Sequence, residues 1–325
     1  MPQQADGHGP IFLTATDYEL PEVLPEGIEK YKNFAEMTRG GSGILRSCFD
    51  QLTGRSVVMK SLLPQFVDDE KEKRRLLREA RVTAQLQHPN TVPVYEIGRA
   101  EEVGVYFTMK RISGENFFEI LKRIAITDQD TLKEFPLKAR VEVVINAALA
   151  LSYAHARGVI HRDVKPENIW VGNFGEVILL DWGVAKVWGQ AADEPQHPAV
   201  RQDQQQAIQA LTMSGDRPGT PLYMSPEQVN VHRAALDERT DIFSLGVVLY
   251  EAAALHEPFR GRVIQETFEN ILHDTPPPPS KRRREWSIPE SFDEIVMRAI
   301  EKKPADRFQS MREMIEALRS VQLTD

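Results

Sequence analysis

Hydrophobic and polar positions alternate in short runs over the first third of the chain, between about residues 31 and 111. The runs that we predict to be strands are Ile44–Phe49, Arg55–Ser61, Thr91–Ile97 and Val105–Arg111. One longer segment, Asp68–Leu86, has an acidic start and apolar residues at helical spacing, which predicts a helix. This part of the chain is therefore expected to form a small sheet with one main helix.

Beyond about residue 114 the apolar positions recur at helical spacing instead. Leu137–Arg157 carries a broad apolar face, and Asp241–Leu255 is nearly all apolar, which predicts a buried helix. Further helices are expected at Phe292–Lys302 and Met311–Val321. Strands followed by helices are typical of an α+β fold. We expect a smaller lobe at about residues 31–111 and a larger helical lobe at about 114–320.

Composition limits the classes of protein to which the chain can belong. It has 325 residues, 41% of them hydrophobic, which is enough for two domains with cores of their own. The formal net charge of -8 gives no electrostatic case for a nucleic-acid partner. The single cysteine, Cys48, excludes an intramolecular disulfide and fits the reducing cytoplasm.

The ends of the chain carry weaker signals. Residues 1–30 are rich in Pro, Gly and acidic side chains, which predicts a flexible or loosely packed arm, and residues 321–325 are expected to be a short tail. No run of 18 apolar residues occurs, and the N-terminus lacks the pattern of a signal peptide. We expect a cytoplasmic chain that reaches a membrane only if a longer native protein carries an anchor.

The candidate chemistry lies in one short segment, His161-Arg162-Asp163-Val164-Lys165-Pro166-Glu167-Asn168. Asp163 can orient a substrate hydroxyl and accept its proton, and Lys165 can neutralise a transferring phosphoryl group. Asn168 can hold Mg²⁺ beside them. A polar surface loop is the alternative, but these identities at this spacing rarely arise by chance. The segment resembles the catalytic loop of the protein kinase family, which implies a two-lobed fold with an antiparallel-sheet N-lobe.

Other motifs extend the resemblance over roughly residues 31–320. Gly40, Gly41, Ser42 and Gly43 resemble the Gly-rich loop that covers the ATP phosphates, although a simple hairpin turn would also explain them. The family places a Lys that contacts the α and β phosphates at Lys60, held by a Glu at Glu79. The resemblance implies ATP-binding positions at Gly40, Gly41, Ser42, Gly43, Leu45, Val58, Lys60, Glu79, Met109, Lys110, Ile112, Trp170 and Asp181.

The metal ion and the activation segment follow from the same resemblance. Asp181, in Asp181-Trp182-Gly183, would bind Mg²⁺ together with Asn168, with Mn²⁺ as a substitute. Thr220, in Gly219-Thr220-Pro221, would help to present the substrate. Arg162 would hold a phosphate on Thr212 or Ser214, although both can be ordinary loop hydroxyls and Asp216 can supply a permanent anion. Two bracing contacts are also implied, between Glu227 and Arg307 and between Asp241 and the backbone of the catalytic loop.

The resemblance is strongest to bacterial serine/threonine kinases of the eukaryotic-like kind, and Lys165 matches the Ser/Thr type. It implies ATP, protein substrates with Ser or Thr, and a homodimer for phosphorylation between copies. Departures occur at Thr38, Thr83 and Trp170, where the family has Gly, an apolar residue and a medium aliphatic residue. They leave open a kinase-shaped scaffold that binds partners with little turnover. A small-molecule phosphotransferase is a third alternative, but it would lack a segment such as Gly219–Glu227, which this chain has.

Overall fold

The structure is a computed structural model, and it describes residues 24–183, 185–187, 220–230, 236–284 and 286–323. The chain divides into an N-terminal unit, Met1–Gly114 with Gly172–Phe174, and a C-terminal unit, Glu115–Val171 with Gly175–Asp325. The first is built mainly of strands and the second mainly of helices, which confirms the predicted α+β class. Most of the predicted N-terminal arm lies outside the described residues.

A five-stranded antiparallel sheet forms the N-terminal unit, in the order β1-β2-β3-β5-β4. Its strands are β1 (Tyr31–Arg39), β2 (Gly43–Asp50), β3 (Arg55–Leu62), β4 (Val94–Ala100) and β5 (Gly104–Lys110). The predicted runs correspond to β2 to β5 within a few residues. β1 is an edge strand, and after Tyr31 all of its residues are exposed.

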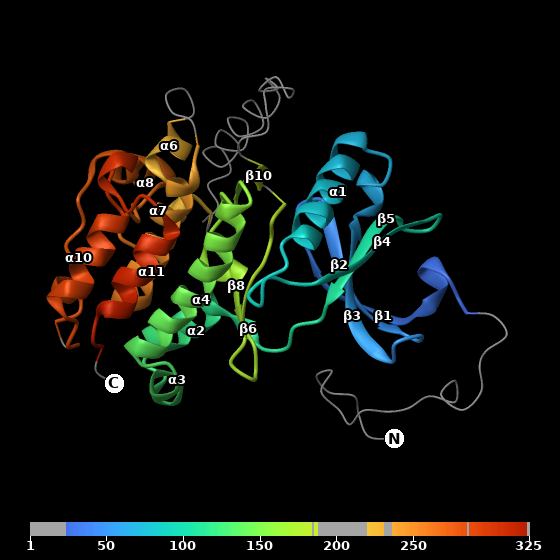
Figure 1. The fold of residues 1–325 in the computed structure, drawn as a ribbon, viewed down its shortest axis with the longest axis horizontal. Helices are drawn as coiled ribbons and strands as arrows, with labels where there is room; N and C mark the ends of the chain where they lie inside the picture. The colour runs from blue at the N-terminus through green and yellow to red at the C-terminus, as the bar shows by residue number, and fades with distance from the viewer. Residues whose placement is uncertain (1–23, 184, 188–219, 231–235, 285, 324–325) are drawn as a thin grey trace. The chain divides into compact units, whose positions relative to one another are not determined.

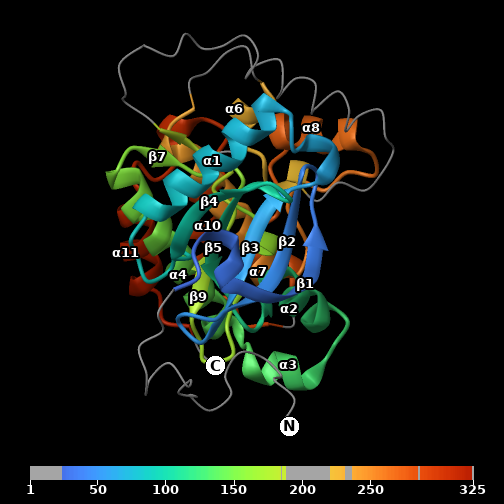
Figure 2. The same cartoon turned by 90° about the vertical axis from the view of Figure 1, so that its right-hand side faces the viewer.

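One helix, α1 (Glu70–Gln85), lies along this sheet, as Figures 1 and 2 show. The carboxylate of Asp69 caps its N-terminus by accepting from the amides of Lys71 (2.8 Å) and Glu72 (3.1 Å). Its Leu76 and Ala80 pack with Leu62 and Phe107 of the sheet. This packing fixes the face of α1 that the sheet meets, and with it the position of Glu79.

The last residues of the predicted arm are ordered rather than loosely packed. Gly27–Lys30 form a 3-10 turn, and Ile28 packs against the cluster of Tyr31, Cys48, Val57, Met59 and Tyr106 on the sheet. Lys30 forms an ion pair with Glu96 of β4. A second short 3-10 helix, Pro64–Phe66, precedes α1. Apolar contact and charge pairing therefore attach the Gly27–Lys30 turn to the rest of the N-terminal unit.

Packed helices make up most of the C-terminal unit. They are α2 (Phe117–Ala125), α3 (Gln129–Glu134), α4 (Leu137–Ala156), α6 (Pro226–Val229), α7 (Glu238–Ala254), α8 (Ile264–His273), α9 (Pro279–Arg282), α10 (Glu290–Ala299) and α11 (Met311–Ser320). The nearly apolar α7 is buried along its length, as predicted. It packs closely on α10, because a Cβ on Gly246 would lie only 2.7 Å from Ala299 Cβ.

Short strands and 3-10 turns position the loops of this unit. The strands are β6 (Glu115–Asn116), β7 (Val159–Ile160), β8 (Ile169–Val171), β9 (Val177–Leu179) and β10 (Lys186–Val187), and the turns are Pro166–Asn168, Thr220–Tyr223 and Pro304–Asp306. β8 and β9 pair as an antiparallel hairpin beside β6. Among the residues that the structure describes, no helix is both long and apolar enough to cross a membrane.

Candidate active site

An ion pair joins β3 to α1 in the N-terminal unit. Lys60 Nζ lies 2.5 Å from Glu79 Oε1, and the two side chains are 22% and 12% exposed. Lys60 lies in β3 and Glu79 lies on α1. The structure therefore brings the two predicted phosphate-anchor residues together.

Strand register places three more of the predicted positions on the same face of the sheet as Lys60. Leu45 lies opposite Lys60, and Val58 lies opposite Met109. Because side chains alternate between the faces of a strand, Leu45, Val58, Lys60 and Met109 project from one face of the sheet. This is the face that α1 covers in part, since Met109 also packs against the α1 cluster.

The Gly-rich segment forms the turn between β1 and β2. Gly40 N–H donates to the Gly43 carbonyl (2.8 Å), and Leu63 N–H donates to the Ser42 carbonyl (2.8 Å). A Cβ on Gly40 would meet only the Gly43 carbonyl, at 3.9 Å, and a Cβ on Gly41 would meet nothing within 4 Å. Neither glycine has a positive φ. Packing and backbone conformation therefore do not require glycine at these positions.

Lys110, another predicted ATP-binding position, lies at the end of β5. Lys110 N–H donates to the Pro93 carbonyl (3.0 Å). The Lys110 N–H is therefore engaged and cannot donate to an adenine edge. Ile112 is half-buried just beyond the strand.

In the C-terminal unit the catalytic-loop side chains converge on one carboxylate. Lys165 Nζ donates to Asp163 Oδ2 (2.7 Å), and Asn168 Nδ2 donates to the same oxygen (3.2 Å) and to the Asp163 carbonyl (2.8 Å). The side chains of Asp163 and Lys165 are 17% and 16% exposed, so both are partly shielded from water. Because Nδ2 of Asn168 is engaged, its Oδ1 is the atom that can bind a metal ion.

The β8–β9 hairpin brings Asn168 and the Asp181 segment together. Leu180 N–H donates to the Asn168 carbonyl (2.8 Å), just before Asp181. The exposed Asp181 has a φ of +63°, which is rare for a non-glycine residue, and its Oδ1 accepts from Gly183 N–H (3.2 Å). No cluster of three or more His, Cys, Asp or Glu that could hold a metal occurs in the described part of the chain. An Asn and an Asp suit Mg²⁺, which keeps waters and binds substrate phosphates beside few protein ligands.

His161 connects the catalytic loop to the Asp181 segment. Its ring nitrogen Nε2 donates to the Leu180 carbonyl (2.9 Å), because a carbonyl can only accept, and Nδ1 accepts from Asp163 N–H (3.3 Å). The ring meets the indole of Trp182 edge to face, with ring centroids 4.6 Å apart. Trp182 is 1% exposed, so its indole is buried beside the His161 ring.

Asp241, at the start of α7, holds the backbone of the catalytic loop, as predicted. It accepts from the amides of His161 and Arg162, both at 2.8 Å, and from His155 Nε2 at 2.7 Å. Burial alone would raise the pKa of Asp241, but the hydrogen bond from His155, the neighbouring histidines and the amide of Arg162 hold it below its usual value. Burial raises the pKa of Glu167, beside Asn168.

The remaining predicted positions are placed only in part. Trp170 is half-buried in β8, opposite Ile178, and its Nε1–H is buried without a partner among the described residues. Thr220 begins the 3-10 turn Thr220–Tyr223, but its side chain lies outside the description. Thr212 and Ser214 also lie outside the described residues.

Comparison with known proteins identifies the family to which the chain belongs. A family model described as a protein kinase domain matches residues 31–318. The chain belongs to the protein kinase family. The family as a whole uses ATP and a divalent metal ion.

Several bacterial serine/threonine-protein kinases are similar to this kinase domain. PknD of Protochlamydia amoebophila is 30% identical over 302 residues, which cover 90% of this chain and 30% of that protein. PknD of Chlamydia trachomatis serovar D is 32% identical over 302 residues, with 90% and 31% covered. Pkn3 of Myxococcus xanthus is 34% identical over 284 residues, with 86% and 47% covered. The chain thus spans about a third to a half of these relatives, and the expected resemblance to bacterial kinases is confirmed.

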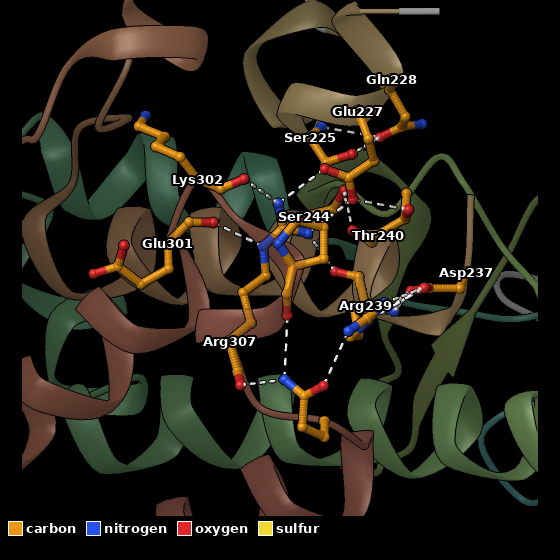
Figure 3. A network of polar contacts seen from close by, with 12 residues as sticks. Ser225, Glu227, Gln228, Asp237, Arg239, Thr240, Ser244, Glu301, Lys302 and Arg307 are labelled. Atoms are coloured by element: carbon orange, nitrogen blue, oxygen red, sulfur yellow. Dashed lines mark hydrogen bonds and ion pairs between the residues drawn. The ribbon is translucent and has the colours of Figure 1, made fainter. Parts of the chain in front are cut away.

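A buried ion pair joins α6 to the segment before α11, as Figure 3 shows. Both terminal nitrogens of Arg307 donate to the Glu227 carboxylate at 2.8 Å, which confirms the predicted pair. The two side chains are 0% and 4% exposed. Arg307 also donates to backbone carbonyls of Arg239, Glu301 and Lys302, and Glu227 accepts from the Thr240 hydroxyl (3.0 Å).

Sequence reasoning missed two residues that support the catalytic loop. His155 lies on α4 and donates to Asp241, far from it in the sequence. Gln228 donates to the Arg162 carbonyl (2.8 Å) from α6. Its place three residues after Ser225 is the signature of a helix cap, but nothing in the sequence marks the contact with Arg162.

Proposed function

We propose that this kinase domain transfers the γ-phosphate of ATP to Ser and Thr hydroxyls of protein substrates, including its own activation segment. The observation that carries the proposal is the convergence of Lys165 and Asn168 on the Asp163 carboxylate, at 2.7 and 3.2 Å. The names of the bacterial relatives support serine and threonine as acceptors. The domain would span residues 31–320, with lobes at about 31–111 and 114–320, and two copies would phosphorylate each other.

Each residue of the site has one role in this proposal. Asp163 accepts the proton of the attacking hydroxyl, and Lys165 offsets the negative charge on the transferring group. Lys60, held by Glu79, anchors the α and β phosphates. Asn168 Oδ1 and the Asp181 carboxylate hold Mg²⁺, or Mn²⁺ in its place, and the ion supplies charge neutralisation at the phosphates when bound.

The nucleotide positions lie on one face of the sheet and in the Gly-rich turn. Gly40, Gly41, Ser42 and Gly43 allow phosphate oxygens to approach the backbone, because packing and conformation do not explain the glycines at 40 and 41. Leu45, Val58 and Met109 project from the same face as Lys60 and provide apolar contact for the base. The Lys110 carbonyl and the Ile112 amide are assigned to the adenine edge.

The test is transfer of label from γ-³²P-ATP to a generic protein substrate with Mg²⁺ or Mn²⁺. The wild type is compared with Asp163→Asn, and ATP binding is measured in parallel for both. The proposal expects labelled protein only with the wild type and ATP binding with both. ATP binding without transfer by the wild type would instead identify a scaffold, and transfer only to small molecules would identify the third alternative.

Replacing Lys60 with Met is expected to lower the rate of phosphoryl transfer at least ~100-fold, because it removes a charge that stabilises the transition state. The measurement is kcat/KM for ATP with a saturating protein substrate. Lys32→Met, on the exposed part of β1, is the matched control and should keep wild-type activity. Activity above a tenth of wild type in Lys60→Met would refute the assignment of Lys60.

Replacing Trp170 with Leu is expected to change the affinity for ATP, because we assign the indole to the nucleotide base. If the indole stacks on the base, the substitution removes the stacking and the affinity for ATP falls. If the indole fills the base pocket, the substitution opens the pocket and the affinity rises. Calorimetric titration with ATP measures the change, and the thermal midpoint should stay unaltered. An unchanged affinity would show that the indole points away from the base.

Phosphorylation of Thr212 or Ser214 is expected to activate the domain. A phosphate adds about −2 charge and can form charge-assisted hydrogen bonds with Arg162, just before the base. Incubation with ATP followed by mass spectrometry locates the phosphate, with Asp163→Asn as the control that cannot label itself. The hypothesis fails if no phosphate maps to residues 190–220, or if the double variant Thr212→Ala with Ser214→Ala keeps full activity.

A further inference from the structure

Arg162, the residue before Asp163, is held at its N–H and at its carbonyl in an unusual backbone conformation. Arg162 has a φ of +69°, in the left-handed region that non-glycine residues rarely adopt. Its N–H donates to Asp241 Oδ1 (2.8 Å), and its carbonyl accepts from Gln228 Nε2 (2.8 Å). Strained conformations persist only where the surroundings determine them, so these two contacts act as restraints on Arg162.

The orientation of the Gln228 amide follows from its second contact. Gln228 Oε1 accepts from the backbone N–H of Ser225 (3.0 Å) and from its hydroxyl (3.2 Å). An N–H can only donate, so the oxygen of the amide must face Ser225 and the nitrogen must face Arg162. The side chain thereby links the N-terminus of α6 to the catalytic loop.

The element that carries Gln228 is itself firmly attached. The preceding residue, Glu227, is held by the buried Arg307 and by Thr240, and Figure 3 shows Gln228 beside this network. Ser225, which orients the amide, is fully buried. The Gln228 side chain therefore connects α6, which is fixed in place, to the carbonyl of Arg162, the residue before the base.

We infer that Gln228 is a positioning residue for Asp163. It restrains the Arg162 carbonyl and so sets the direction in which the Asp163 side chain leaves the backbone. This inference rests on the proposed function, because it assigns Gln228 to the reaction of Asp163. Without the contact from Gln228, the backbone angles of Arg162 can relax toward the common right-handed or extended regions, which displaces the Asp163 carboxylate.

A role in helix capping alone predicts different behaviour. Gln228→Glu retains an oxygen that can accept from Ser225 but loses the donor to Arg162. Gln228→Met loses both contacts without adding charge, and Ser225→Ala removes only the hydroxyl of the cap. A cap would be preserved by Gln228→Glu, whereas positioning would be lost in both Gln228 variants and kept in Ser225→Ala.

The experiment measures kcat, KM for ATP, and hydrogen exchange of the backbone amides of residues 161–164 in the full chain of all four proteins. We expect kcat to fall about 10- to 100-fold in both Gln228 variants, with KM for ATP nearly unchanged. Amide exchange in residues 161–164 should accelerate at least about tenfold in the same two variants. Ser225→Ala should match the wild type in kcat and in exchange.

Several outcomes would overturn the inference. Unchanged kcat or unchanged amide exchange in either Gln228 variant would do so, and so would equal losses in Ser225→Ala. A loss in Gln228→Glu alone would mean that the added charge is responsible. If the wild type transfers no phosphate, the proposed function fails, and the exchange measurement by itself decides whether Gln228 restrains the loop.

Discussion

Asp181→Asn is expected to lower the rate of phosphoryl transfer at least ~100-fold while leaving the fold intact, because it removes charge that stabilises the transition state. The carboxylate is one of the two protein ligands that we assign to Mg²⁺, and Asn keeps its size but not its charge. Asp181 is exposed, so the substitution does not bury the new amide. Steady-state kinetics at saturating Mg²⁺ measure the loss.

A matched control comes from α3 of the same unit. The side chain of Asp130 is 98% exposed and belongs to no part of the site, so Asp130→Asn should keep wild-type activity. Residual activity above a tenth of wild type in Asp181→Asn would contradict the metal assignment. A lower thermal midpoint in that variant would point to a structural role for Asp181 instead.

Arg307→Met is expected to lower the free energy of unfolding by about 3–5 kcal/mol, because it leaves the Glu227 carboxylate buried without its partner. Both side chains of this pair are almost fully excluded from water. Lost hydrogen bonds to the backbone of Arg239, Glu301 and Lys302 add to the effect. Urea unfolding followed by circular dichroism measures the change.

An exposed ion pair provides the comparison for this result. Lys122 and Glu119 lie 3.3 Å apart with side chains 59% and 45% exposed, so Lys122→Met should cost less than about 1 kcal/mol. Both substitutions remove one cation from an ion pair in the same unit and replace it with Met. Equal losses in the free energy of unfolding in the two variants would show that burial of the Arg307–Glu227 pair does not increase the cost of breaking it.

Periodicity predicted the elements whose burial is regular. The nearly apolar Asp241–Leu255 run corresponds to α7, since a helix buried on all sides has no polar face to interrupt the pattern. β1 gave no such signal, because it is an edge strand whose residues after Tyr31 are all exposed. The 3-10 turn Gly27–Lys30 is held by contacts of Ile28 and Lys30 with distant strands. Local composition cannot reveal such contacts.

In the candidate site, too, the sequence indicates contacts between residues close in the chain but not contacts between distant residues. Spacing within the catalytic loop was enough to propose Asp163, Lys165 and Asn168, because short-range geometry brings them together. The pair of Lys60 and Glu79 depended on the resemblance, since nothing local relates a strand residue to one on the next helix. The contact of Gln228 with Arg162 spans 66 positions and involves a backbone carbonyl, which carries no sequence signal.

Phosphoamino-acid analysis of the labelled product tests the central claim most directly. A protein substrate is labelled with γ-³²P-ATP and Mg²⁺ by the wild type and by Asp163→Asn, hydrolysed in acid, and separated into phosphoserine, phosphothreonine and phosphotyrosine. We expect label on Ser and Thr, none on Tyr, and a loss of at least ~100-fold with Asp163→Asn, which removes the base. Label on tyrosine, or equal labelling by Asp163→Asn and the wild type, would contradict the proposed function and the role of Asp163.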